Sequence, residues 1–254
     1  MSVQQRRVEI IRQLHRDGYV EAKKLSGEFG VDTSTIRRDL DVLVRSGQAE
    51  RTHGGAKAVG GAALDVPYAV KEFERRQQKV AIAAHATARV REGDSVVLDS
   101  GSTTFQVAMA LRNIPDLTFI TNDLRIATLL AAVPDVRLFL AGGELLNSVF
   151  TLTGPRATEF FSDFSATWAF LGADALDSEA GITNTNTREV PVKRAMIEAA
   201  STSIVVADSS KFESRTLARV AALDEVDHLV TDVGLDTAIA AKYGSRLERV
   251  DFEQ

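Results

Sequence analysis

The chain has 254 residues, of which 44% are hydrophobic and 26% charged, a composition typical of a globular protein of one or two domains. No apolar run approaches the ~18 residues of a membrane span, and Met1–Arg16 lacks a signal-peptide core. The absence of cysteine excludes disulfides and thiolate chemistry and fits the cytoplasm. Residues 1–60 carry 11 Lys and Arg against 8 Asp and Glu, and the remainder carries 19 against 27, so the net charge of −5 hides a basic head. This asymmetry indicates that only the head meets phosphate groups.

Three short helices and a hairpin are expected in the first 56 residues. Apolar residues at helical spacing predict a first helix over Val3–Arg16, which Asp17-Gly18 ends. A second helix is expected from about Val20 to Phe29 and is stopped by Gly30. A third begins near Asp32 or Thr33, either of which can cap it. The apolar face of this third helix consists of Ile36, Leu40, Leu43 and Val44.

The second and third helices, joined by a short turn, are typical of a helix-turn-helix, in which the second of the two lies in the major groove of DNA. After Gly47, the run Gln48–Ala56 predicts a two-stranded wing. Arginine can bind guanine through two hydrogen bonds, and serine or threonine can bind a base or a phosphate. The candidate DNA-binding residues are Thr33, Ser34, Thr35, Arg37, Arg38, Arg45, Arg51 and His53. The alternative is that Arg37 and Arg38 are merely a solvated helix face, and Asp39 is expected to cap or pair locally.

The rest of the chain predicts a linker and an α/β domain. Residues 1–58 form the winged helix-turn-helix domain, the Gly/Ala-rich segment 59–72 the linker, and residues 73–254 the sensor and oligomerisation domain. Short β-rich runs alternate with helical segments, which predicts a doubly wound, mostly parallel sheet. The expected strands are Ser95–Asp99, Leu117–Thr121, Val136–Ala141, Thr167–Leu171, Ser203–Asp208 and His228–Thr231.

A polar, glycine-containing loop follows the first of these strands and opens a helix over Thr104–Leu111. A loop of this kind presents backbone N–H groups and hydroxyls to an anion at the N-terminus of the helix. Its residues, all candidates for binding a phosphorylated effector, are Asp99, Ser100, Gly101, Ser102, Thr103 and Thr104. The alternative is an ordinary capped turn between a strand and a helix, in which serine and threonine are common.

Other polar residues follow strands whose carboxyl ends meet at the same edge of the expected sheet, where ligands bind in open α/β folds. Lys211 is a candidate partner of a phosphate, and Asp174 or Glu144 of sugar hydroxyls. The candidate effector-binding residues of these loops are Thr121, Asn122, Gly142, Gly143, Asp174 and Lys211.

Two strings in the head resemble the DeoR family of bacterial regulators. Residues 30–40 read GVDTSTIRRDL and residues 51–56 read RTHGGA, which are similar to the family's "GVS-x-x-TIRRDL" helix and "R-x-HGGA" wing. The sequence departs from the pattern at Asp32, where serine is common. The resemblance implies sequence-specific binding to double-stranded operator DNA, usually to repress sugar-catabolic genes.

From about Phe73 to Asp232 the chain also resembles the DeoR-type sensor domain, which is similar in fold to ribose-5-phosphate isomerase. The resemblance implies a phosphorylated sugar as effector. The isomerase string "DGADE" corresponds to residues 171–175, where Leu171 and Ala175 replace the first and last acids, and its catalytic lysine falls near Ala180. Its "TRE" corresponds to residues 187–189, which makes Glu189 a further effector-binding candidate, and its "ADxSK" corresponds to the segment that ends at Lys211. An isomerase needs a placed base and enediolate stabilisation, so these losses imply binding without turnover.

The sequence therefore predicts a regulator that acts as a repressor of sugar-metabolism genes and is gated by a sugar phosphate. It is expected to be a cytoplasmic homo-oligomer, a dimer or a tetramer, without a membrane partner, cofactor or metal, since its four histidines are scattered. The alternatives are a transcriptional activator, a nucleotide sensor, or an isomerase-like enzyme that carries a DNA-binding head. The absence of a G-x-G-x-x-G string counts against a dinucleotide as the ligand.

Overall fold

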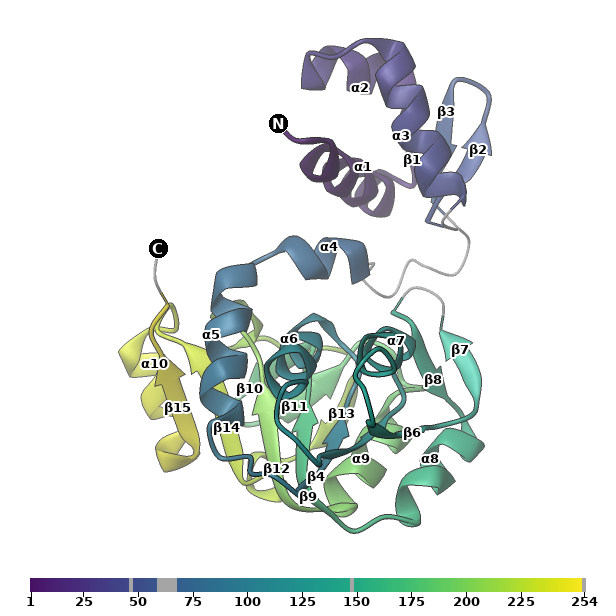
Figure 1. Cartoon of the computed structure of the whole chain (residues 1–254). Coiled ribbons are helices and arrows are strands. Elements are labelled where there is room, and N and C mark those ends of the chain that lie inside the picture. Colours follow the sequence, from purple (N-terminus) through teal and green to yellow (C-terminus); the bar gives the residue numbers. More distant parts are fainter. Residues whose placement is uncertain (46–47, 59–67, 147–148, 253–254) are drawn as a thin grey trace. The chain divides into compact units, whose positions relative to one another are not determined.

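The computed structural model describes residues 1–45, 48–58, 68–146 and 149–252 (Figure 1). The chain divides into two compact units, Met1–Glu74 and Arg75–Gln254. Each unit has a hydrophobic core of its own, with one cluster of buried side chains in the first and two in the second. Within the described ranges, no helix is both long and apolar enough to cross a membrane.

The first unit is a small helical domain with a short sheet. The end predicted for its first helix is confirmed, since Gly18 ends it in the left-handed conformation (φ 73°). The start of this helix is capped by Ser2 and Gln5, each of which accepts from the other's backbone N–H, a cap that was not predicted. The described elements of this unit are α1 (Val3–Asp17), β1 (Tyr19–Glu21), α2 (Ala22–Phe29), α3 (Thr33–Arg45), β2 (Glu50–Thr52), β3 (Gly55–Lys57) and α4 (Tyr68–Phe73).

The sheet of this unit has three strands, in the order β1-β3-β2, and not two. The prediction of a helix from Val20 was wrong at its start, because the chain pairs β1 with β3 before α2 begins at Ala22. The pairing depends on Gly55, where a Cβ atom would lie only 2.0 Å from the carbonyl oxygen of Val20. Three residues are too few for a strand pattern to stand out in the sequence.

Helix α4 lies in the segment 59–72 that the sequence analysis assigned to a linker. The residues of that segment before Tyr68 lie outside the described residues. Tyr68 is 1% exposed, and α4 packs against α1 within the first unit. The described end of the expected linker is therefore a helix with a buried anchor.

The second unit is built on a seven-stranded sheet in which every neighbouring pair of strands is parallel. It confirms the predicted fold class, and each of the six expected strands is present with ends shifted by at most three residues. The seventh strand, β15, was not predicted, because its polar sequence (LERV) lacks the apolar character of a buried strand. The strands are β4 (Ser95–Leu98), β5 (Thr118–Thr121), β6 (Arg137–Leu140), β9 (Ala166–Leu171), β12 (Ala200–Val206), β14 (His228–Asp232) and β15 (Leu247–Val250).

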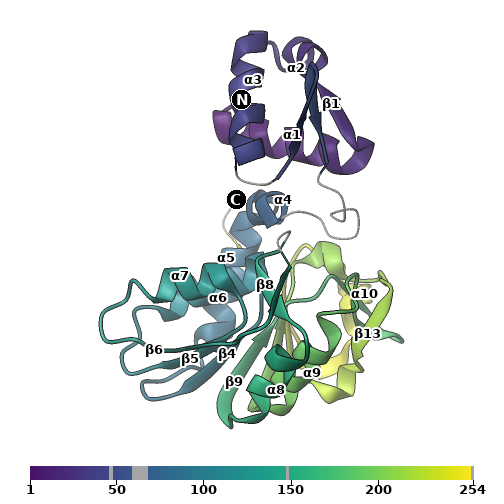
Figure 2. The same ribbon diagram turned by 90° about the vertical axis from the view of Figure 1, so that its right-hand side faces the viewer.

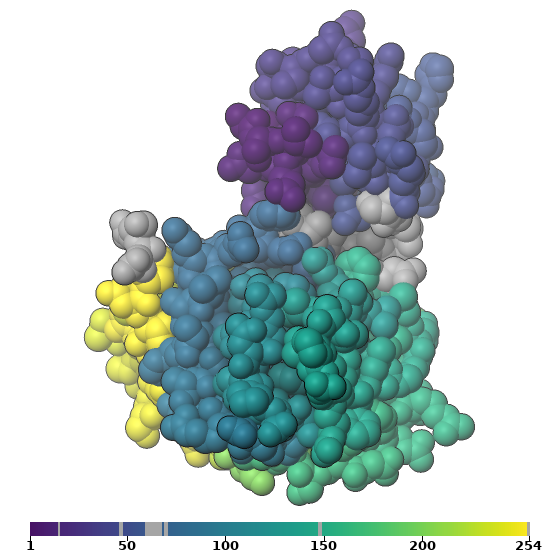
Figure 3. Space-filling view, viewed as in Figure 1, coloured from purple at the N-terminus to yellow at the C-terminus, as the bar shows by residue number. Residues whose placement is uncertain are grey.

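Helices cover both faces of this sheet (Figure 2). Strand side chains alternate between the two faces, so Val96 and Leu98 join one core cluster while Val97 joins the other. The first cluster lies under α5 (Arg76–Thr87), α6 (Ser102–Leu111) and α7 (Leu124–Leu130), and the second lies under α8 (Pro155–Ser162) and α9 (Val190–Glu198). In the space-filling view of Figure 3, residues of α5, α6 and α7 (blue to teal) form much of the visible face of this unit.

The strand order β15-β14-β12-β9-β4-β5-β6 determines where a ligand can bind. From β4 the chain adds β5 and β6 on one side, and it then returns to β9 and adds β12, β14 and β15 on the other side. The boundary between β4 and β9 is therefore the topological switch point, and ligands of open α/β sheets bind there, beyond the carboxyl ends of the strands.

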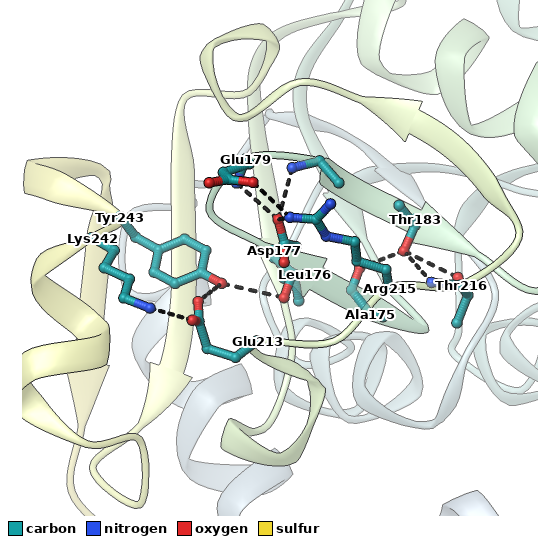
Figure 4. A network of polar contacts seen from close by, with 11 residues as sticks. Ala175, Leu176, Asp177, Glu179, Thr183, Glu213, Arg215, Thr216, Lys242 and Tyr243 are labelled. Carbon is teal, nitrogen blue, oxygen red and sulfur yellow. Dashed lines mark hydrogen bonds and ion pairs between the residues drawn. The ribbon is translucent and has the colours of Figure 1, made fainter.

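Two further small sheets, which the sequence analysis missed, complete the unit. One pairs β7 (Glu144–Leu146) with β8 (Thr151–Thr153), and the other has the order β10-β11-β13, with bounds Ala175–Asp177, Gly181–Asn184 and Ala218–Ala221. A polar network ties the second sheet to α10 (Thr237–Ala241) and the residues after it (Figure 4). In it the Tyr243 hydroxyl donates to the Leu176 carbonyl oxygen at 3.2 Å, and Arg215 pairs with Asp177 at 2.8 Å and Glu179 at 2.9 Å.

Candidate DNA-binding surface and effector site

Helix α3 has one buried and one exposed face, as the sequence predicts. Ile36, Leu40 and Leu43 are at most 3% exposed and belong to the core of the first unit. The opposite face presents most of the expected DNA-binding residues: Ser34, Arg37, Arg38 and Arg45 are exposed, and Thr33 and Thr35 are half-buried. The arginines are therefore available to a partner rather than packed into the core.

The turn before α3 fixes the direction in which this helix leaves α2. Gly30 adopts the left-handed conformation at φ 64° and ends α2. Asp32 then accepts a hydrogen bond from the Ser34 backbone N–H at 2.7 Å, and the Ser26 hydroxyl donates to the Val31 carbonyl at 2.7 Å. The Thr33 hydroxyl donates to Ser26 at 3.2 Å, so it is engaged inside the turn.

Asp39 does not pair locally, which corrects the expectation from the sequence. Its carboxylate is 2% exposed and accepts from Arg6 Nε and Arg7 Nε of α1, each at 2.7 Å. Arg6 is itself 5% exposed. Because a buried charge needs both a counter-charge and hydrogen bonds, this cluster fixes the inner face of α3 against α1. The charged residue between two apolar positions of the helix, Ile36 and Leu40, was the available signal.

The wing consists of β2 and β3 with a tight turn at His53-Gly54, where Gly54 has φ 82°. His53 and Arg51 are exposed. The Arg51 guanidinium lies 3.4 Å from the Asp41 carboxylate of α3, a surface pair that contributes little to stability. The two remaining DNA-binding candidates are thus on the same small domain as α3 and open to solvent.

In the second unit, the 99–104 loop leads from β4 into α6 as predicted. Gly101, at φ 140°, precedes the first residue of α6, and a Cβ atom there would lie 3.3 Å from Thr104 Oγ1. The Thr104 hydroxyl is fully buried and donates to the Gly101 carbonyl at 2.9 Å. Ser100, Ser102 and Thr103 are buried but not completely, at 7–8% exposed. The loop therefore places the N-terminus of a ten-residue helix at the switch point.

Asp99 faces a lysine that the sequence analysis missed. Lys193 of α9 is 3% exposed, forms an ion pair with the Asp99 carboxylate, and donates to the Gly172 carbonyl oxygen at 3.0 Å. The Gly172 N–H donates to Asp99 Oδ2 at 2.8 Å. These contacts bridge the carboxyl ends of β4 and β9. The sequence carried a signal of this buried lysine, because Lys193 is three residues from both Val190 and Met196 and so falls on the apolar stripe of the helix.

Two more of the expected residues gather around Lys193. Burial by itself lowers the pKa of Lys193, but the carboxylates of Asp99, Glu189 and Asp174 outweigh burial and raise it, so the lysine is a cation. Glu189 is 7% exposed and accepts from Asn184 Nδ2 at 3.1 Å, and Asp174 accepts from the Thr185 N–H at 3.0 Å. Three carboxylates and one ammonium thus meet beside the switch point.

The segment after β5 adds another buried carboxyl to this site, and this one was not predicted. Asp123 accepts from the backbone N–H groups of Arg125 at 2.7 Å and Ile126 at 2.9 Å, and so caps α7. Burial raises the pKa of Asp123 to about 6. The expected residues before it have structural partners, since Thr121 Oγ1 donates to the Leu98 carbonyl at 2.7 Å and Asn122 Nδ2 to the Leu152 carbonyl at 3.1 Å.

The remaining effector candidates lie further along the same sheet edge. Gly142 and Gly143 follow β6, which β5 separates from β4, and a Cβ atom on Gly143 would lie 2.4 Å from the Thr153 carbonyl oxygen, so this glycine permits close packing with β8. Lys211 is half-buried in the short 3₁₀ helix Ser209–Lys211 after β12, which β9 separates from β4. Among the described residues, no hydrogen bond or ion pair joins either group to the 99–104 loop.

A groove of 670 Å³ lies beside these elements. Arg188 donates to Glu144 Oε1 at 2.8 Å within it. Of the effector candidates named from the sequence, Glu144 lines this groove and the others do not; the lining consists of Glu144, Thr153, Gly154, Pro155, Thr158, Glu159, Arg188 and Pro191.

A winged helix-turn-helix with an exposed arginine face, joined to an α/β unit with polar loops at its switch point, defines a DNA-binding transcription regulator with a sensor domain. Comparison with known families agrees with this class. The model of the DeoR-like helix-turn-helix domain matches residues 6–60, and that of the DeoR C terminal sensor domain matches residues 74–233. The chain belongs to the DeoR family.

Curated relatives align over almost the whole chain. The transcriptional repressor AccR of Agrobacterium fabrum is 36% identical over 94% of this chain and 93% of its own length. A putative aga operon transcriptional repressor of Escherichia coli O157:H7 is 34% identical over 91% of this chain and 87% of its own. The glycerol-3-phosphate regulon repressor of Escherichia coli K12 is 32% identical over 91% and 92%.

Among solved structures, ribose 5-phosphate isomerase from Plasmodium falciparum is 15% identical and covers 53% of this chain and 52% of its own, with a TM-score of 0.39. The delta subunit of eIF2B from Chaetomium thermophilum is 14% identical and covers 63% and 57%, with a TM-score of 0.46. Both likenesses are too distant to carry a residue's role over to this chain.

Proposed function

We propose that the protein is a transcriptional repressor of sugar-metabolism genes whose binding to operator DNA is relieved by a phosphorylated sugar. The observation that carries the DNA-binding part is the two-faced α3: Arg37 and Arg38 are exposed, while Asp39 beside them is buried and paired to α1. The DNA contacts are assigned to Thr35, Ser34 and the exposed arginines of α3, with the wing on the flanking backbone.

The effector is assigned to the switch point, with its phosphate at the N-terminus of α6. Gly101 there has no side chain to obstruct an anion, and the partial positive charge of a ten-residue helix favours one. Ser100, Ser102 and Thr103 supply nearby hydroxyls, and Asp174 and Glu189 supply acceptors for sugar hydroxyl groups. The name of the glycerol-3-phosphate regulon repressor supports a phosphorylated effector.

Binding without turnover is the better hypothesis than catalysis. Lys193, the one lysine among these groups, is held as a cation by Asp99 and is therefore a poor base for abstracting a proton from a sugar carbon. Leu171 and Ala175 stand where the isomerase pattern has acids. A coupled assay with ribose 5-phosphate tests the enzyme alternative, and turnover that depends on Glu189 would favour it.

We further infer that the protein acts in the cytoplasm. We also infer that it is a homo-oligomer, because helix-turn-helix heads read two half-sites when two copies bind together. Duplexes selected from a random pool by the purified protein should then contain repeated half-sites. Sedimentation velocity of the protein and of its complex with such a duplex measures the number of copies. A monomer that binds a single half-site would contradict this part of the proposal.

The effector is tested by a thermal-shift screen with glycerol 3-phosphate, ribose 5-phosphate and N-acetylglucosamine 6-phosphate, against the unphosphorylated compounds and inorganic phosphate. A ligand at 100 times its Kd stabilises the folded state by about 2.7 kcal/mol. The compound that stabilises the protein should also weaken its binding to the selected duplex. Gly101→Val should remove both effects, and a variant that responds like the wild type would exclude the 99–104 loop. A compound that strengthens DNA binding would instead indicate a corepressor.

A further inference from the structure

The boundary between the two compact units falls between Glu74 and Arg75. These two residues form the turn that separates α4, the last helix of the first unit, from α5, the first helix of the second. This covalent connection is a route by which a ligand bound to the second unit can affect the first. The side chains of both residues are engaged, each within its own unit.

Glu74 is tied to the DNA-binding unit. Its Oε1 accepts hydrogen bonds from Nη2 of Arg12 at 2.7 Å and from Nε at 3.1 Å. Arg12 belongs to α1, the helix that also holds α3 through Asp39. The two parallel N–H bonds to one carboxylate oxygen give the pair a defined geometry.

Arg75 is tied to the sensor unit. Its backbone lies in the left-handed region, at φ 50° and ψ 41°, which an arginine rarely adopts without a compensating contact. Its side chain provides that contact, since Nη1 donates to Ser209 Oγ at 3.3 Å and Nε lies 3.5 Å from Asp208 Oδ1. The conformation of the turn is therefore coupled to the position of residues 208 and 209.

Residues 208 and 209 are anchored within the sheet edge where the effector site is proposed. Asp208 lies two residues after the buried end of β12, is 2% exposed, and accepts from the Ser210 N–H at 3.1 Å. The Ser209 N–H donates to Asp232 Oδ1 at 2.8 Å. The same short segment carries Lys211, the candidate phosphate partner on this loop. A displacement of this loop would act directly on the Arg75 guanidinium.

We propose that Arg75 is a positioning residue for the effector response: its contacts with Asp208 and Ser209 transmit a ligand-induced shift of the loop after β12 to the turn that leads into the DNA-binding unit. The inference rests on the proposed function, since it requires an effector at the carboxyl edge of the sheet. Arg75 need not touch the effector or the DNA. The turn can adopt a second conformation, because release of the guanidinium removes the contact that holds the backbone of Arg75 in the unfavourable left-handed region.

The experiment measures the operator Kd with and without each sugar phosphate of the screen, using the full-length protein. In the wild type we expect the ratio of the two Kd values to be about tenfold, within the usual range of allosteric coupling. In Arg75→Ala the ratio should fall below about twofold, while the thermal shift caused by the same compound persists. Arg76→Ala is the matched control, because Arg76 is the adjacent exposed arginine and the described part of the chain offers it no ion pair. This variant should keep the wild-type ratio.

Two further variants separate the side chain from the backbone. Arg75→Gly permits the left-handed turn without the guanidinium, and it should lose the response as Arg75→Ala does. Asp208→Asn keeps an acceptor for the Ser210 N–H but removes the charge that faces Arg75. If both act through one contact, the double variant of Arg75→Ala and Asp208→Asn should respond no less than either single variant.

A wild-type response in both Arg75→Ala and Arg75→Gly would overturn the proposal while leaving the proposed function intact. Loss of the thermal shift in Arg75→Ala would also overturn it, because Arg75 would then be a ligand of the effector and not a positioning residue. A wild-type protein that neither binds nor responds to any of the three sugar phosphates would refute the effector assignment, and with it this inference.

Discussion

Replacing Asp123 by Asn should change how the stability of the second unit depends on pH. The Asp123 side chain is fully buried, and its Oδ1 accepts both capping hydrogen bonds of α7. Its other oxygen, Oδ2, has no donor within hydrogen-bonding distance among the described residues, and the backbone N–H of Gly101 acts on the carboxyl as a further influence that lowers its pKa. Asparagine keeps an accepting oxygen for the cap and removes only the ionisable group. The substitution therefore isolates the effect of the buried charge.

The magnitude follows from the pKa. Burial raises the pKa of Asp123 from an ordinary 3.8 to about 6, so the folded protein holds this proton more tightly than the unfolded chain does. The native state is relatively favoured below pH 3.8, and this advantage is lost as the pH rises through 6. The difference between the two pKa values corresponds to about 3 kcal/mol of unfolding free energy. At pH 8 the buried charge lowers the unfolding free energy of the wild type by this whole amount, whereas Asp123→Asn has no such charge.

Urea unfolding followed by tryptophan fluorescence reports on the second compact unit, to which Asp123 belongs. The sequence has a single tryptophan, Trp168, which lies on β9 and donates its indole N–H to Asp94 at 2.8 Å. The unfolding free energy of Asp123→Asn minus that of the wild type should rise by about 2.5 kcal/mol between pH 4 and pH 8, because the unfolded carboxyl is already half ionised at the lower pH. Any constant cost of the amide group cancels in this comparison. A difference that stays constant over this range would refute a raised pKa at Asp123.

Four other substitutions, one of them with a compensating second change, test the two sites. Arg37→Ala and Arg38→Ala should each weaken operator binding by about 1–3 kcal/mol and leave the thermal shift with sugar phosphate unchanged, as measured by fluorescence anisotropy and differential scanning fluorimetry. Asp39→Asn leaves two arginines facing each other without their carboxylate and should lower the stability of the first unit by about 3–5 kcal/mol, measured by circular dichroism. Lys193→Met should destabilise the second unit by a similar amount through the unpaired Asp99, and Asp99→Asn in the same chain should restore much of this loss. Unchanged DNA affinity, or an unchanged midpoint, would contradict the role given to the residue concerned.

Much of the fold could be predicted from local patterns. The apolar stripe at Ile36, Leu40 and Leu43 defines the buried face of α3, and hence its exposed one, because side chains on an α-helix repeat every 3.6 residues. Each of the six predicted strands of the second unit contains a short apolar run, as expected for strands of a parallel sheet between two layers of helices. Their alternation with helices predicts the doubly wound architecture.

The elements that escaped prediction are short or polar. Strands of three residues, such as β1 and β10, contain too few side chains to show an alternation, and they form because another segment offers backbone partners. Edge strand β15 is polar because most of its side chains are only half-buried, and its charged pair is engaged at the surface, Glu248 by Arg89 and Arg249 by the Val233 carbonyl. In each case the information lies in the partner and not in the segment itself.

The sequence by itself determined the family, the two-part organisation and the residue types that reach the exposed face of α3. The tertiary structure alone decided which partners the buried carboxylates meet: Asp39 two arginines of α1, Asp99 Lys193, and Asp208 of the loop after β12 the exposed Arg75. The physical reason is that a charge can be buried only where its counter-charge is brought to it, and those partners lie between 32 and 134 residues away in the chain. Spacing along a helix or strand carries no information about contacts at that range.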